Sequence, residues 1–157
     1  MDFPLGYILA MNPEEISTKW PNLKIGDNFS YTSLKRRGFN CVAYALEFEN
    51  KDWDMLVFAK IYNLDKTQLD HSANGYAKIF SEKFGFEKCD NPNLEEGFKK
   101  IALYENNEGD FTHIARQMES GKWTSKMGNY EDIEHYDLIG ISGNFYGKPS
   151  MYMRKVI

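Results

Sequence analysis

The chain has 157 residues, of which 42% are hydrophobic and 27% charged, and its formal net charge is -4. This length accommodates one domain with a hydrophobic core, and the composition is that of an ordinary globular protein. Acidic and basic residues are interspersed, so the chain lacks the basic face of a nucleic-acid binder and we expect no nucleic-acid partner. Aromatic residues reach 15%, which favours a β-containing core or an aromatic-lined groove.

No apolar run approaches the ~20 residues that a membrane-spanning helix requires, so we expect no membrane association. The first residues, MDFPLGYILAMNPEE, contain a short apolar patch with no basic residue before it. They lack the pattern of a secretory signal peptide, and we expect a cytoplasmic protein. Cys41 and Cys89 are too few for a disulfide scaffold, so free thiols in a reducing compartment are the simpler interpretation.

The N-terminal half has the pattern of helices. Residues 1–38 are punctuated by prolines and glycines and are predicted to be irregular. A helix is predicted from Asn40 to about residue 50, because Asn40 is a good N-cap and apolar residues follow at helical spacing. Residues 51–70 are ambiguous, since the run DMLVFAKIY fits a strand or a helix. A further helix is predicted over residues 71–84, with Gly85 as its stop signal.

The C-terminal half has the pattern of β-strands. Strands are predicted over residues 85–90, 98–106, 111–119, 122–128 and 148–157, with the turn sequences NEGD and SG between the middle three. The segment NYEDIEHY at residues 129–136 is predicted to be a short helix or a loop. Helices followed by antiparallel strands make an α+β fold, and we expect residues 1–157 to form one domain.

Cys41 is predicted to lie in the first turn of the helix after Asn40. The free N–H groups of a helix N-terminus stabilise a thiolate, and a nucleophilic cysteine needs a base such as histidine. His113 is the best candidate, because it lies near the start of a predicted strand in a hairpin. Pairing within that hairpin is expected to bring Ser125 alongside, where its hydroxyl would orient the imidazole. Packing in the core is the alternative role for each of these residues.

These motifs resemble those of NlpC-type papain-like cysteine peptidases and their amidase relatives. NCVAYAL is similar to the nucleophile helix of that superfamily, and HIARQMESGKWTS is similar to the hairpin that carries its histidine and third polar residue. The segments NCVAYAL, GFKKIALYENNEGDFTHIARQMESGKWTSKMG and DIEH resemble, more closely, an uncharacterised bacterial domain family of about this length. The resemblance implies a papain-like domain in which the nucleophile helix packs on an antiparallel sheet.

The resemblance also implies a cysteine hydrolase or transferase that acts on an amide-like bond, as a peptidase, amidase or deamidase. Cys41 would be the nucleophile, His113 the general base and Ser125 the orienting residue. The superfamily's third residue is commonly His, Asn or Gln, so Asp132 and His135 stay open as alternative orienters. The substrate would be peptide-like or a protein. No HExxH, CxxC, GxGxxG or Walker-type motif is present, and we expect no metal and no cofactor.

Substrate-binding residues are expected on the same hairpin. Arg116 and Gln117 suit a carboxylate or an amide, and the WTSK segment, with Trp123 and Lys126, suits a groove wall. Two alternatives to an enzyme stay open. One is a catalytically inactive papain-like binding module that uses these residues for recognition, and the other is a small phage or bacterial conflict protein. An exposed thiol close to His113 would favour the enzyme, and a buried or separated pair would favour the binding module.

Overall fold

The computed structural model describes residues 18–24, 26–32, 40–48, 51–127 and 132–157. Within these ranges seven strands form one sheet in the order β1-β6-β5-β4-β3-β7-β2, and every neighbouring pair is antiparallel. The elements are β1 (Phe29–Tyr31), α2 (Cys41–Leu46), α3 (Met55–Ile61), α4 (Ala73–Phe84), β2 (Glu87–Cys89), β3 (Phe98–Glu105), β4 (Phe111–Gln117), β5 (Trp123–Lys126), β6 (Asp132–His135), the 3-10 turn η1 (Ile139–Ile141) and β7 (Lys148–Val156). The predicted α+β class is confirmed.

Side-chain caps determine where the helices begin. Asn40 Oδ1 accepts a hydrogen bond from the backbone N–H of Ala43 at 3.1 Å, so α2 begins at Cys41 as predicted. The helix ends earlier than predicted, because Glu47 takes a left-handed backbone conformation with φ 64°. The ambiguous run is helix α3, which Asp54 caps. Helix α4 begins two residues after its predicted start and ends at Phe84 as predicted, with Gly85 as its C-cap.

Two short strands differ from the prediction. The segment predicted to be a helix or a loop contains β6, which pairs with β5 on one side and β1 on the other. Strand β1 itself lies in the stretch predicted to be irregular. Both predictions were wrong for the same reason: a strand of three or four residues is stabilised by its neighbours in the sheet, and its own pattern is too short to indicate it.

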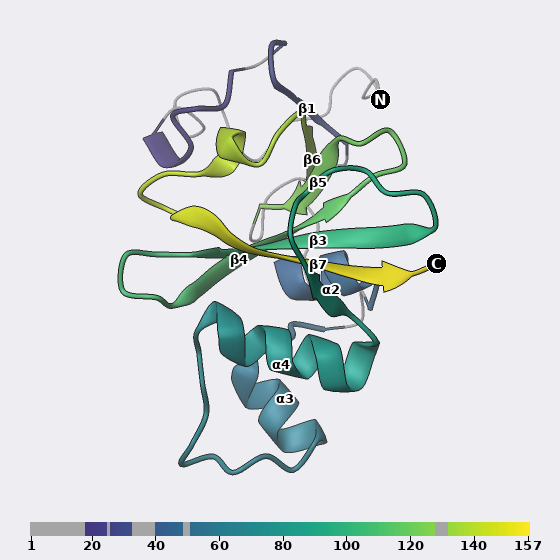
Figure 1. Ribbon diagram of the computed structural model, residues 1–157. Coiled ribbons are helices and arrows are strands. Elements are labelled where there is room, and N and C mark those ends of the chain that lie inside the picture. The colour runs from purple at the N-terminus through teal and green to yellow at the C-terminus, as the bar shows by residue number, and fades with distance from the viewer. Residues whose placement is uncertain (1–17, 25, 33–39, 49–50, 128–131) are drawn as a thin grey trace.

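The sheet separates two hydrophobic clusters. On one face lie helices α2, α3 and α4 (Figure 1), which pack over alternate residues of the central strands; we call this the helix-side core. Its sheet residues are Ile101, Leu103, Ile114 and Met153. On the other face, the described N-terminal residues and the segment around η1 pack over the intervening positions; we call this the η1-side core. It includes Trp20, Leu23, Ala102, Tyr104, Ala115, Trp123, Leu138, Ile141 and Tyr146.

Helix α2 contacts β4 and β5, the strands that carry the histidine and serine singled out in the sequence. The expected helix packed on an antiparallel sheet is therefore present. The more specific papain-like assignment stays a prediction.

Candidate functional site

Cys41 is half-buried at the start of α2 and packs against the helix-side core. Burial is the largest influence on its thiol and raises the pKa to about 11. Backbone hydrogen bonds with Ile114, Val42 and Cys41 itself, and the charge of Lys126, act in the opposite direction. The thiol is consequently protonated at neutral pH in this structure.

His113 is wholly buried, with 0% of its surface exposed. Its ring stacks on Tyr146, with centroids 4.0 Å apart and planes inclined by 10°, and meets the edge of Tyr104 at 5.7 Å. Burial, followed by the charge of His135, lowers the pKa of the imidazole well below its usual 6.5. Neither ring nitrogen has a hydrogen-bond partner among the described residues. The imidazole is therefore neutral and carries two unused polar atoms.

Cys41 lies next to strand β4 at the residue that follows His113, but the thiol and the imidazole do not form a hydrogen bond. The thiol contacts the backbone of Ile114, which directly follows His113 in β4. Successive strand residues point to opposite faces. Ile114 belongs to the helix-side core, whereas the His113 ring stacks on Tyr146 of the η1-side core. The predicted thiol–imidazole pair is thus close along the strand but not hydrogen-bonded.

Ser125 is engaged by His135 instead of His113. Ser125 Oγ lies 2.8 Å from His135 Nε2, and His135 Nδ1 lies 2.8 Å from the backbone oxygen of Asp137. Because a carbonyl only accepts, Nδ1 carries the proton and the serine hydroxyl donates to Nε2. Burial lowers the pKa of His135 to about 4, so this histidine is also neutral.

The sequence offered little indication of this buried serine–histidine pair. It depends on β5 and β6 lying side by side, and β6 was not predicted. Asp132, the other candidate orienter, is buried at the far end of β6, where it faces Lys126 across the β5–β6 pairing. The two alternative orienters therefore lie at opposite ends of one short strand.

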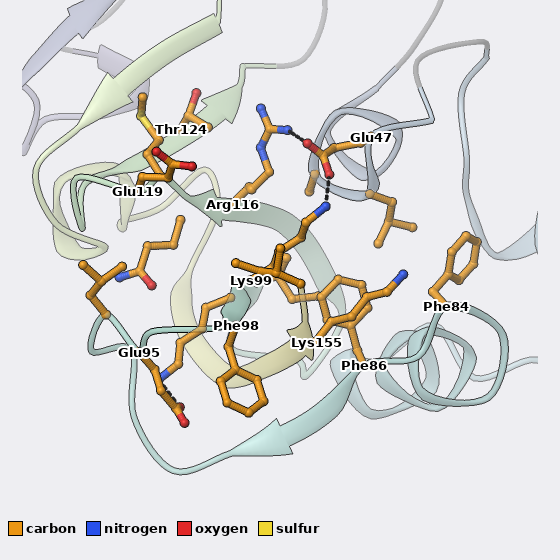
Figure 2. A pocket seen from close by; sticks show the side chains of 18 of the residues that line it. Glu47, Phe84, Phe86, Glu95, Phe98, Lys99, Arg116, Glu119, Thr124 and Lys155 are labelled. Carbon is orange, nitrogen blue, oxygen red and sulfur yellow. Dashed lines mark hydrogen bonds and ion pairs between the residues drawn. The ribbon is translucent and has the colours of Figure 1, made fainter.

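A groove of about 1020 Å³ lies at the C-terminal end of α2 (Figure 2). It runs over β3 and β4 and is bordered by residues 94–98. Arg116 and Gln117, two of the expected substrate-binding residues, line it. Trp123 and Lys126 do not: they are 3% and 0% exposed, and Trp123 packs in the η1-side core. Cys41 is not in the groove either, because it begins the helix whose last turn forms the groove wall.

Charged side chains converge at the centre of this groove. The Glu47 carboxylate lies 2.8 Å from Lys99 Nζ and 2.7 Å from Arg116 Nη1, and Figure 2 shows it between them. These contacts hold the pKa of Glu47 below its usual value, and the hydrogen bond with Lys99 contributes most to this shift. The Arg116 guanidinium also lies 4.7 Å from the centre of the Tyr44 ring. Gln117 instead donates to the backbone oxygen of Pro92 at 2.9 Å, so it anchors the groove border.

Within the described ranges, no three His, Cys, Asp or Glu side chains are placed to hold a metal ion. None of the helices in that part of the chain is long and apolar enough to cross a membrane.

Residues 30–154 match the model of a family described as a domain of unknown function (DUF7689), and the chain belongs to that family. The matched range contains Cys41, His113, Ser125 and His135, strands β2 to β6, and most of β1 and β7. The description names no reaction and no relation to NlpC-type peptidases. Comparisons with curated proteins and with solved structures found no match.

Proposed function

We propose that the protein is a thiol-dependent hydrolase or transferase that acts on an amide-like bond, with Cys41 as nucleophile and His113 as base. One observation carries the proposal: among the described residues a wholly buried imidazole has no partner for either nitrogen, and the next strand residue contacts the thiol. Leaving a buried polar atom unsatisfied costs about 1–3 kcal/mol. A buried polar side chain that lowers stability in this way and makes no hydrogen bond is typical of a functional site.

The reaction that fits these groups begins from a neutral pair. An imidazole with a lowered pKa is unprotonated at neutral pH and is able to accept the thiol proton. Cys41 Sγ bonds to the acyl carbon, its proton passes to His113, and His113 transfers it to the leaving nitrogen as the amide bond breaks. Water, or an amine in a transferase, then cleaves the thioester and restores the thiol. This sequence requires the imidazole to leave its stack on Tyr146 and reach the sulfur.

The backbone around the sulfur supports the same chemistry. Three backbone hydrogen bonds, with Ile114, Val42 and Cys41, lower the thiol pKa and therefore stabilise a developing negative charge at the sulfur. A thiol at the first residue of a helix on an antiparallel sheet is also the arrangement that the NlpC-type resemblance implies. Ser125 has no part in orienting the base in this proposal, because its hydroxyl is bound to His135.

The inactive binding module is the second candidate, and the charge state of the thiol is the observation that favours it. A thiol with a pKa of about 11 is almost wholly protonated at neutral pH and is a poor nucleophile unless a base assists it. The absence of a hydrogen bond to His113 among the described residues favours the same interpretation.

Alkylation by iodoacetamide separates the two candidates. The rate at Cys41 and at Cys89 is measured by peptide mass spectrometry across the pH range in the wild type and in His113→Asn. If His113 serves as base, the substitution slows Cys41 alkylation at neutral pH by about tenfold or more. Cys89, a free thiol on β2, is the internal control for folding and reagent. Equal Cys41 rates in both proteins would overturn the proposal and leave the binding module.

A further inference from the structure

Three cations and one carboxylate, that of Glu47, gather at the centre of the groove, whose lining as a whole carries four acidic and four basic side chains. Lys99 on β3 and Lys155 on β7 are direct partners in the sheet register, so their side chains leave the same face side by side. Arg116 on β4 lies on this face one strand away, opposite Ile101. Like charges directly opposite each other on a sheet destabilise it. Lys99 and Lys155 share one row of the sheet and Arg116 lies in the next row on the same face, so the three cations together favour a negative group between them.

Glu47 supplies only part of that negative charge. Its carboxylate binds Lys99 and Arg116, whereas no carboxylate of the described residues lies within ion-pair distance of Lys155. The Lys155 ammonium instead lies 5.7 Å from the centre of the Phe86 ring. Of the other acids along the groove, Glu95 is paired with Lys100 and Arg154. Figure 2 shows Glu95 and Glu119 on the opposite side of the groove from Glu47.

The position of Glu47 also allows another carboxylate to displace it. Its side chain is 48% exposed, so solvent screens its two ion pairs and keeps both of them weak. It stands in a left-handed backbone conformation immediately after α2, outside the helix. The site thus already binds a carboxylate weakly, and a carboxylate is the chemistry that its cations select.

Beside the cations the groove is aromatic. Phe84 and Phe86 line it beside Lys155, as Figure 2 shows, and Phe48 adds a ring that is about half exposed. The volume of about 1020 Å³ is at the upper end of small-molecule pockets, about 300–1,000 Å³. An open groove of this size, with aromatic and cationic side chains next to one another, suits a peptide that carries both acidic and apolar side chains.

We infer that this groove is a docking site for an acidic peptide segment, whose carboxylates bind Lys155 and the Lys99–Arg116 pair while its apolar side chains pack on the phenylalanines. This inference goes beyond the proposed function. The groove lies at the opposite end of α2 from the thiol, so peptide binding does not depend on Cys41 chemistry.

Fluorescence anisotropy with labelled peptides tests the inference. The probe peptide alternates glutamate with phenylalanine and leucine, and a matched peptide has glutamine in place of every glutamate. The glutamate peptide is expected to bind at least about tenfold more tightly, and added salt is expected to weaken it. The double variant Lys99→Gln/Lys155→Gln is expected to abolish that preference. Glu47→Gln is expected to tighten binding, because it removes the internal competitor.

Lys88→Gln/Lys122→Gln is the matched control, since it removes two cations that do not line the groove. It is expected to leave the affinity unchanged, as is Cys41→Ser, which isolates docking from any chemistry at the thiol. Equal binding of the glutamate and glutamine peptides would overturn the inference and identify an apolar groove only. Unchanged binding by the Lys99→Gln/Lys155→Gln protein would place the peptide elsewhere and overturn it as well.

Discussion

Acidification from pH 7 to pH 5 is expected to destabilise the folded protein through its two buried histidines. His113 and His135 are both neutral in the folded state, since burial lowers the pKa of each. In the unfolded chain each histidine takes up a proton below its ordinary pKa of about 6.5. A lowered folded-state pKa means that the stability is fully present above about 6.5 and is lost as the pH falls toward the folded value.

The size of the effect follows from His135, whose pKa is about 4. Each pH unit between the unfolded and folded pKa values costs about 1.4 kcal/mol, so the fall from about 6.5 to 5 removes about 2 kcal/mol. Acidification also lowers the stability through His113, by at most the same amount of free energy per pH unit. The two histidines together therefore account for a loss of about 2–4 kcal/mol. Carboxylates with lowered pKa values, such as Glu47 and Glu95, remain ionised in this range and do not contribute.

Urea unfolding followed by tryptophan fluorescence at the two pH values measures this loss. In His135→Asn the difference between the two pH values is expected to shrink by about 2 kcal/mol, whatever the substitution does to absolute stability. His71→Gln changes an exposed histidine and is the matched control for the loss of one histidine. A wild-type difference below about 0.5 kcal/mol would refute the assignment of buried neutral histidines.

Two substitutions test the local structure. Asn40→Ala removes a helix cap and two hydrogen bonds with the Trp53 backbone, at 2.7 and 3.2 Å. The free energy of unfolding, measured by urea titration, is therefore expected to fall by about 2–3 kcal/mol. A fall below about 1 kcal/mol would contradict this account. In Gly147→Ala the new Cβ would lie 1.9 Å from the Glu105 backbone oxygen, and a loss of about 3 kcal/mol or more is expected. Gly109→Ala, with φ +83° but open space around it, is the control and is expected to cost only about 1 kcal/mol; equal losses at the two glycines would refute the steric argument.

Local patterns predicted the longer elements well. Helix α4 and strands β3, β4 and β7 each carry a periodic pattern over seven or more residues, and each was found close to its predicted bounds. The start of α2 was predicted to the residue, because a capping side chain acts within its own turn and is visible in the sequence. The short strands β1 and β6 were missed, since only their partners in the sheet stabilise them.

The same difference between local patterns and tertiary contacts applies to the candidate site. The sequence indicated Cys41, His113 and Ser125 as residues worth examining, and their elements do lie side by side. It did not indicate which partner each side chain takes. Ser125 and His135 come together through the β5–β6 pairing, and strand alternation turns the His113 ring toward Tyr146 and away from the face on which α2 packs.

The sequence by itself determined the α+β class, the capped start of α2 and the set of polar residues on the central hairpin. These depend on interactions within a turn or along one strand, which residue type and spacing encode directly. Only the tertiary structure decided the protonation of the thiol and the imidazole, the Ser125–His135 pair and the groove that Glu47, Arg116 and Lys155 line. Burial and contacts between distant segments cause all of these, and they exist only once the sheet has assembled.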